Sequence, residues 1–323
     1  MVTNLPDINT QQIIAQRSSK NTVNANKPYD CMIEVECGSD LVLHRIATLF
    51  LTGSECPFHC VMCDLWKNTL DYATPIGSIP LQILWALENL QIDWQNPLAK
   101  GVSSIKLYNS SNFFDKRAVP IKDWPEIAKL VSAFETIIVE NHPGLCSERI
   151  LKFRDLIAGR LEVAMGLETT HPKLLKWLNK QMTLKQYQNS VDYLITNNIQ
   201  VRSFILVKLP SLTEEEGIEW AVKSMEFAFD CGVECCSLVP VRKGNGFMDQ
   251  LEKDGFFKAP NITSLECVLE SGLSMGRGRV FVDLWDSQAF EGCSSCKSLR
   301  LQRIMEMNEY QSFQPEVQCH ECR

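Results

Sequence analysis

The sequence predicts an α/β protein whose main part is a partial (β/α)6 barrel, followed by a small cysteine-rich extension at the C-terminal end. Six short β-rich runs alternate with longer helix-like segments between residues 45 and 239. Two of these runs are almost entirely apolar, as in strands that are covered on both faces. The alternation ends near residue 245, and two pairs of cysteines follow close to the C-terminus.

Each unit of this pattern pairs one strand with one helix. The expected strands are Arg45–Leu51, Ser103–Tyr108, Thr136–Glu140, Leu161–Gly166, Val201–Val207 and Cys235–Val239, with Val280–Leu284 as a candidate for one more. The expected helices include Leu81–Leu90, Trp124–Phe134, Ser147–Ile157, Leu184–Thr196, Glu214–Phe229 and 262–272. Thr213 precedes three glutamates, which is typical of a capped helix start.

Consecutive βα units predict a parallel sheet. A closed (β/α)8 barrel needs eight units, so six favour a partial barrel, with an open doubly wound sheet as the alternative. We expect three parts: a flexible tail over residues 1–30, the barrel over 31–245, and a metal-binding extension with the second cysteine cluster over 246–323.

The bulk composition limits the classes of function. The chain has 323 residues, of which 45% are hydrophobic and 22% charged, and its net charge of -7 argues against broad nucleic-acid binding. We expect a cytoplasmic protein without membrane segments, because no secretory signal is visible and the apolar stretches are short. In that reducing compartment, clusters among the fourteen cysteines indicate metal ligands rather than disulfides.

The first cysteine cluster follows directly on the first predicted strand. Cys56, Cys60 and Cys63 have the spacing C-x3-C-x2-C, at a strand end where parallel βα folds collect their chemistry. A [4Fe-4S] cluster normally takes four cysteines, so three thiolates would leave one iron open to another molecule. The alternative is a zinc site made from these cysteines and His59.

C-x3-C-x2-C after the first strand of such a barrel resembles the radical S-adenosylmethionine (SAM) superfamily. The resemblance covers roughly residues 40–245 and implies that the open iron binds SAM. It further implies that an electron from the cluster cleaves SAM to methionine and a 5′-deoxyadenosyl radical, which abstracts hydrogen from a substrate. Members of the superfamily usually have an aromatic residue before the third cysteine. Met62 occupies this place here, so Phe58 or Trp66 is an alternative cover for the adenine.

Polar residues at the other strand ends are candidates for binding SAM or substrate. Asn109 stands where the superfamily often has a Gly-Gly-Glu-like turn. The Gly-Leu-Glu-Thr turn around Glu168, before a helix that ends in Asn-Lys, is similar to methylthiotransferases and the Elongator catalytic subunit, and implies a contact from Glu168 to SAM. Lys208 and Arg242 are candidate ligands for the SAM carboxylate or an acidic substrate.

Glu140 and His142 follow the third predicted strand. They are candidates for substrate binding or proton transfer, against the alternative of a capped loop.

The second cysteine cluster consists of two C-x2-C pairs. Paired spacing of this kind is a strong signal for a metal site, either a closed zinc site or an auxiliary [4Fe-4S] cluster, with free thiols in a disordered tail as the alternative. The four cysteines are Cys293, Cys296, Cys319 and Cys322.

We therefore expect a radical SAM enzyme with a [4Fe-4S] cluster and SAM as cofactors. The alternative is a non-catalytic iron–sulfur or zinc protein that binds metal or transfers electrons. The substrate is open between a small molecule, a peptide and an RNA, and the electron donor is expected to be a flavodoxin or a ferredoxin.

Overall fold

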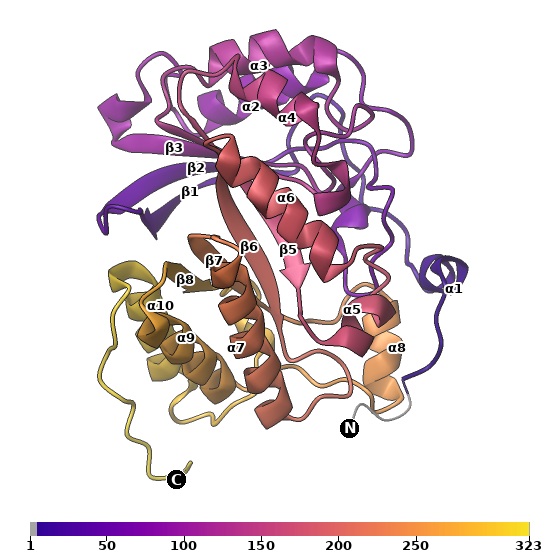
Figure 1. Cartoon of the computed structure of the whole chain (residues 1–323), viewed down its shortest axis with the longest axis vertical. Coiled ribbons are helices and arrows are strands. Elements are labelled where there is room, and N and C mark those ends of the chain that lie inside the picture. Colours follow the sequence, from indigo (N-terminus) through magenta and orange to yellow (C-terminus); the bar gives the residue numbers. More distant parts are fainter. Residues whose placement is uncertain (1–4, 323) are drawn as a thin grey trace.

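The strands form one curled sheet (Figure 1). In the computed structural model, which describes residues 5–322, eight strands follow one another across the sheet in chain order, with β1 and β8 at its edges. β1 is antiparallel to β2, and all later neighbours are parallel. The strands are β1 (Asp30–Cys37), β2 (Leu43–Phe50), β3 (Val102–Tyr108), β4 (Thr136–Glu140), β5 (Arg160–Glu168), β6 (Gln200–Val207), β7 (Cys235–Pro240) and β8 (Arg279–Val282).

The six predicted strands are all present as β2 to β7, and β4 has the predicted bounds. The half-barrel is therefore confirmed, but the count of six is not. β8, foreseen as a candidate over Val280–Leu284, adds a seventh parallel strand. β1 lies inside the region expected to begin the barrel and was missed. It alternates apolar and polar residues from Ile33 to Cys37, a pattern that suits an edge strand.

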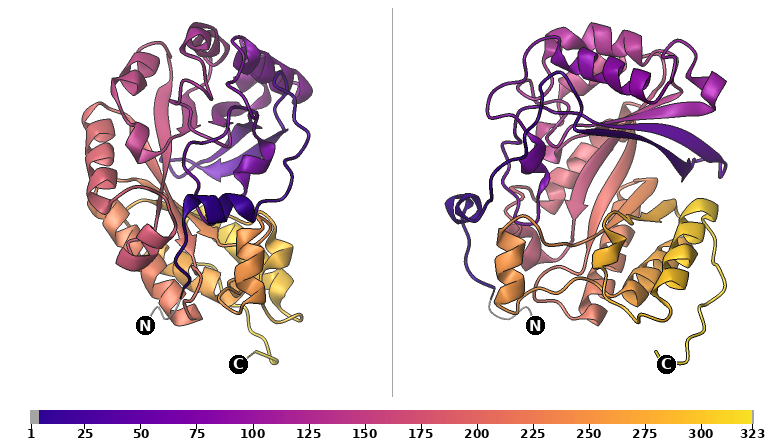
Figure 2. Two further views of the ribbon diagram at one scale, coloured as in Figure 1. Left: turned by 90° about the vertical axis from the view of Figure 1, so that its right-hand side faces the viewer. Right: turned by 180° about the vertical axis from the view of Figure 1, so that it is seen from behind.

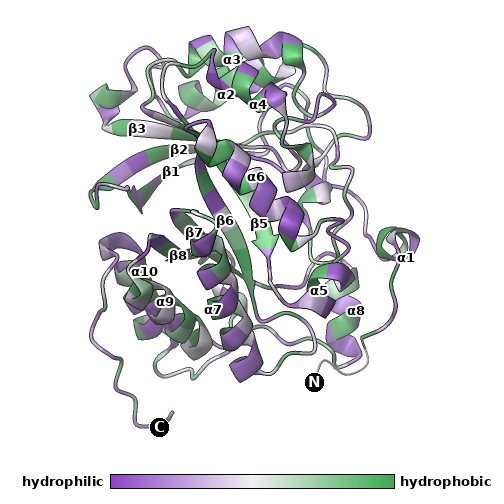
Figure 3. Ribbon diagram, in the orientation of Figure 1, coloured by the Kyte–Doolittle hydropathy of each residue, from purple (hydrophilic) through white to green (hydrophobic). Residues whose placement is uncertain are grey.

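The helices cover the outer face of the sheet (Figure 1). Where α6 and α7 face solvent they carry hydrophilic residues, whereas the strands they cover are largely hydrophobic (Figure 3). None of the helices in the described chain is long and apolar enough to cross a membrane. The helices are α1 (Thr10–Ala15), α2 (Ser78–Asn89), α3 (Trp124–Leu130), α4 (Glu148–Arg154), α5 (Pro172–Trp177), α6 (Leu184–Thr196), α7 (Glu214–Asp230), α8 (Phe247–Lys253), α9 (Ile262–Met275) and α10 (Lys297–Tyr310).

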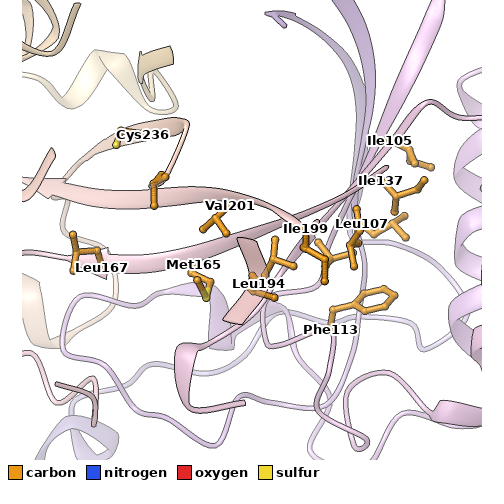
Figure 4. Close-up of a cluster of buried hydrophobic side chains, with 14 of the residues drawn as sticks. Ile105, Leu107, Phe113, Ile137, Met165, Leu167, Leu194, Ile199, Val201 and Cys236 are labelled. Carbon is orange, nitrogen blue, oxygen red and sulfur yellow. The ribbon is translucent and has the colours of Figure 1, made fainter. Parts of the chain in front are cut away.

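The hydrophobic core lies between the sheet and these helices. Ile105, Ile137, Met165 and Val201 point outward from four neighbouring strands and are at most 1% exposed. Leu194 of α6 packs in the same cluster (Figure 4). Burying an aliphatic side chain of this size contributes about 1.5–3 kcal/mol each, so this layer is a main source of stability.

The inner face of the sheet carries charged side chains near the N-terminal ends of the parallel strands. Glu36 of β1 pairs with Lys106 of β3 at 2.8 Å and also with Arg202 of β6. Arg202 pairs with Glu162 of β5 at 2.7 Å, and Arg279 of β8 lies 3.6 Å from both carboxylates. The burial of these charges is compensated within the network, which closes this end of the half-barrel.

The N-terminal segment crosses the other end of the half-barrel. α1 lies over the C-terminal ends of the strands (Figure 2). Arg17 and Lys20 each pair with Glu55, at 2.6 Å and 2.7 Å, on the loop that follows β2. The expected flexible tail therefore has fixed contacts over residues 5–29, while residues 1–4 lie outside the described part.

The chain beyond residue 245 belongs to the same architecture. β8 pairs with β7, α9 packs against α7 and α10, and α10 contacts β1. The boundary expected near residue 245 thus falls between neighbouring strands of one sheet.

Candidate functional site

The three-cysteine loop begins where β2 ends, at the C-terminal edge of the parallel strands. Cys60 is buried, and Cys56 and Cys63 are half-buried. Burial raises the pKa of all three thiols, that of Cys60 to about 12. Cys56 raises the pKa of Cys60, and Cys56 and Cys60 both raise the pKa of Cys63, which indicates that the three thiols lie in one region.

This arrangement fits an iron–sulfur cluster. A buried thiol stays protonated unless a cation stabilises the thiolate, and iron supplies that charge. A [4Fe-4S] cluster is larger than a single ion, so its cysteines are held further apart than the ligands of one metal ion. Within residues 5–322, the only group of His, Cys, Asp or Glu donors whose ligand atoms all lie within 4.8 Å of each other is at the C-terminus. The alternative zinc site with His59 is not assembled.

Side chains from two later strand ends hold the first part of the loop. Asn112 donates a hydrogen bond from Nδ2 to Cys56 Sγ at 3.1 Å, and its Oδ1 accepts from the His142 backbone at 2.7 Å. The His142 ring stacks on Phe58 with centroids 3.7 Å apart. Burial lowers the pKa of the His142 imidazole to about 3, so the ring is neutral near pH 7. Its role in substrate binding or proton transfer stays a prediction.

The second part of the loop is tied to the turn after α5. The Val61 amide donates to the Leu178 carbonyl at 3.0 Å, and Asn179 Nδ2 donates to the His59 carbonyl at 2.8 Å. Asn245, from beyond β7, donates to the Val61 carbonyl at 2.6 Å. Sequence reasoning missed this role of Asn245, because no spacing rule connects residues so far apart.

Glu168 and Lys180 form an ion pair beside the cysteine loop. Their charged atoms are 2.5 Å apart, and the side chains are 8% and 9% exposed. Gly166 leaves room for the pair, since a Cβ there would collide with both charged groups. Glu168, predicted to contact SAM, therefore lies at the expected strand end, but its carboxylate already holds a cation. The sequence singled out Lys180 only as the lysine of the Asn-Lys motif, without a role of its own.

The end of β3 presents an unsatisfied amide. Asn109 is 0% exposed, and neither Nδ2 nor Oδ1 has a hydrogen-bond partner among residues 5–322. The Asn109 backbone donates to Glu140 Oε2 at 3.3 Å. Burial raises the pKa of Glu140 to about 7, although this hydrogen bond and Lys180 oppose the shift. A buried amide without partners is costly, which suits a position that a ligand completes.

The remaining predicted residues lie around this site with partners of their own. Met62 packs on an apolar cluster that includes Leu174. Lys208 pairs with Glu214 at 3.1 Å and donates to a backbone carbonyl, that of Lys258. Arg242 is half-buried, and its guanidinium lies 3.8 Å from Asp286.

Aromatic side chains on the inner face form a second group that sequence reasoning missed. Phe50, at the end of β2, contacts Tyr108 and Trp285 with ring centroids 6.3 Å and 6.1 Å apart, and Tyr108 contacts Phe204. Phe50, Tyr108 and Phe204 remain half-exposed in strands that are otherwise mostly buried. The sequence signal for this group was the alternation of side chains between the two faces of each strand, which places all three rings on the inner face.

The C-terminal cysteines come together into one compact group. Cys293 Sγ lies 3.9 Å from Cys319 Sγ, and Cys296 Sγ lies 3.3 Å from Cys322 Sγ. All four sulfurs are within 4.8 Å of each other. Arg300 of α10 donates from Nε to Cys296 Sγ at 3.3 Å. The four predicted ligands are therefore brought together into a group that could hold a metal ion.

Comparison with known proteins identifies the fold. No protein-family model matches the chain. An uncharacterized protein of Methanocaldococcus jannaschii is 23% identical over 231 residues, which cover 68% of this chain and 62% of that protein. An N-terminally shortened Elp3 of Methanocaldococcus infernus is 17% identical, with a TM-score of 0.51 over 71% of this chain and 59% of its own. The chain shares its fold with this archaeal Elp3.

A third comparison is with coproporphyrinogen III oxidase (HemN) from Escherichia coli, described as a radical SAM enzyme. It is 12% identical, with a TM-score of 0.42 over 69% of this chain and 50% of its own. This chain spans less than two thirds of the length of the curated relative and of Elp3. What these comparisons establish is the fold that the chain shares with Elp3.

Proposed function

We propose that this protein is a radical SAM enzyme in which Cys56, Cys60 and Cys63 hold a [4Fe-4S] cluster. The observation that carries the proposal is the position of this loop. One buried and two half-buried cysteines lie at the C-terminal edge of the half-barrel, with hydrogen bonds that fix the loop from three directions. When bound, the cluster supplies the electron that cleaves SAM into methionine and a 5′-deoxyadenosyl radical.

The protein's own groups bind and orient the ligands in this proposal. Glu168 accepts the SAM ammonium or ribose, and the unsatisfied Asn109 amide completes its hydrogen bonds with SAM or substrate. Lys208 and Arg242 bind a carboxylate or an acidic part of the substrate after exchanging their present partners. Met62 lies next to the third cysteine, where it covers the adenine.

Anaerobic reconstitution tests this proposal. Wild-type protein should acquire about four irons at this site, and with dithionite and SAM it should release 5′-deoxyadenosine. Cys60→Ala should lose both, whereas Cys267→Ala, which removes an exposed cysteine on α9, should lose neither. A cluster without 5′-deoxyadenosine would support the non-catalytic alternative, and no cluster would refute both.

We further propose that the C-terminal cysteines bind zinc rather than an auxiliary cluster. A tetrahedral zinc site with Zn–S bonds of about 2.3 Å places its sulfurs about 3.8 Å apart. The two measured separations, 3.3 Å and 3.9 Å, bracket this value, and all four sulfurs fit within 4.8 Å. Four cysteines leave no open position, so the role of the ion is to hold the C-terminal segment on α10.

Metal analysis distinguishes the two metals. Zinc at this site gives about four irons and one zinc per chain, whereas an auxiliary cluster gives about eight irons. Cys296→Ser should remove the zinc and leave the iron content unchanged. Loss of iron in that variant would contradict the assignment.

For the substrate we propose only a chemical class, which is a small molecule, a peptide or an RNA. We favour one with a flat ring, because Phe50, Tyr108 and Phe204 offer half-exposed aromatic faces at the mouth of the half-barrel. The electron is proposed to come from a flavodoxin or a ferredoxin, in the cytoplasm. Substitution of these aromatics by leucine should weaken substrate binding and leave the cluster content intact.

A further inference from the structure

Arg300 of α10 turns part of its guanidinium toward the C-terminal cysteine group. Nε donates a hydrogen bond to Cys296 Sγ at 3.3 Å, and Nη2 lies 4.0 Å from Cys322 Sγ. Cys296 stands just before α10, one turn ahead of Arg300, and helical side chains lean toward the N-terminus of their helix. Arg300 is the only basic side chain in residues 5–322 that donates to any of the four sulfurs.

A buried carboxylate on the neighbouring helix fixes this orientation. Glu266 of α9 is 3% exposed and accepts from Nη1 of Arg300. The same Glu266 pairs with Arg303 at 3.2 Å, about one turn further along α10. Since Nη1 is held by the carboxylate, Nε and Nη2 of Arg300 are the groups that face the sulfurs.

The other side of the cysteine group carries an acid instead of a base. Glu321 accepts a hydrogen bond from Ser295 at 2.6 Å, and its carboxylate lies 3.7 Å from Cys293 Sγ. Four thiolates around one zinc ion carry more negative than positive charge. A carboxylate beside them adds to this excess, so the N–H groups of Arg300 are the compensation that the described residues offer at the sulfurs.

We propose that Arg300 is a positioning residue that sets the zinc affinity of this site by hydrogen bonding to Cys296 and Cys322. The inference rests on the proposed zinc site. A donor aimed at a sulfur stabilises the thiolate that the metal binds and fixes its direction. Loss of such an outer partner weakens metal binding by about 10–100-fold. The effect arises from hydrogen bonds at the sulfurs, so the neutrality of the Arg300–Glu266 pair does not remove it.

The first test is the zinc dissociation constant of the full-length protein, measured by competition with a chromogenic chelator. Arg300→Gln should weaken zinc binding about tenfold. Arg300→Lys keeps the charge but loses the planar fork of donors, so its dissociation constant should lie between those of Arg300→Gln and wild type. Arg277→Gln, which removes an exposed arginine beyond α9, should leave the constant unchanged.

The second test separates hydrogen bonding from support of the fold. Cobalt replaces zinc, and the sulfur-to-cobalt charge-transfer band is recorded, with Cys296→Ser as the background for cobalt bound elsewhere. An N–H donor holds the sulfur electrons more tightly, so Arg300→Gln should move this band to lower energy. Arg303→Gln breaks contacts to Glu266 and to the Gln314 carbonyl of the C-terminal segment, and it should leave the band in place.

Wild-type zinc affinity in Arg300→Gln, or a charge-transfer band that does not move, would overturn the inference. If Arg300→Gln does not fold, Arg300→Lys carries the same test, and an unmoved band in that variant has the same meaning. Failure of the proposed zinc site looks different, because wild-type protein would then bind no zinc that Cys296→Ser loses.

Discussion

The carboxyl of Glu140 should make the stability of the protein depend on pH. Burial raises its pKa from an ordinary 4.5 to about 7. The folded state therefore binds a proton more tightly than the unfolded state, so this group costs nothing below about pH 4.5 and destabilises increasingly as the pH rises toward 7. With about 1.4 kcal/mol for each unit of pKa, the full cost above pH 7 is about 3 kcal/mol.

Glu140→Gln removes this cost, because the amide is neutral at every pH. The free energy of unfolding should rise by about 3 kcal/mol at about pH 8 and by less than about 1 kcal/mol at about pH 5. Denaturant unfolding of the apoprotein, followed by circular dichroism at both pH values, measures the difference. Glu135→Gln, an exposed carboxyl just before the same strand, is the control. Equal stabilisation by Glu140→Gln at the two pH values would refute the reasoning.

Three further predictions concern the contacts that hold the site and the barrel. Arg202→Met leaves Glu36 and Glu162 without a main cation, so the free energy of unfolding should fall by about 3–5 kcal/mol, measured by denaturant titration. Asn245→Ala frees the Val61 carbonyl and should cost about 1–3 kcal/mol, with faster loss of iron to a chelator, measured by iron release. Removal of zinc by a strong chelator should lower the thermal midpoint and expose the C-terminal segment to protease, and wild-type protein loaded again with zinc should recover both.

The part of the fold that the sequence predicts best is the sheet interior. β4 over Thr136–Glu140 and α6 over Leu184–Thr196 have the predicted bounds, because apolar runs and a capping box mark both elements locally. Thr183 and Gln186 exchange cap hydrogen bonds at the start of α6. β1 was harder to predict from the sequence, because it has no long apolar run. Its charged side chains find their partners only across the barrel.

The site was predictable where a single loop carries it. The cysteine spacing identified the candidate cluster loop after β2, and the paired cysteines identified the C-terminal group, which the structure brings together. The residues that hold the first loop were not predictable, because Asn112, His142 and Asn245 act through hydrogen bonds formed only after folding. Lys180 lies in a recognisable motif, but its burial next to Glu168 and the thiols is a property of three dimensions.

The open edges of the sheet have a consequence for its shape. In a closed barrel, backbone hydrogen bonds between the first and last strands set the circumference. Here β1 and β8 are connected through Glu36 and Arg279, through the Arg279 bond to the Cys37 carbonyl, and through α10. The curvature of this sheet is therefore controlled by side chains along a seam. Substitutions at that seam can widen or narrow the interior while every strand keeps its register, so access for a substrate can change without rebuilding the fold.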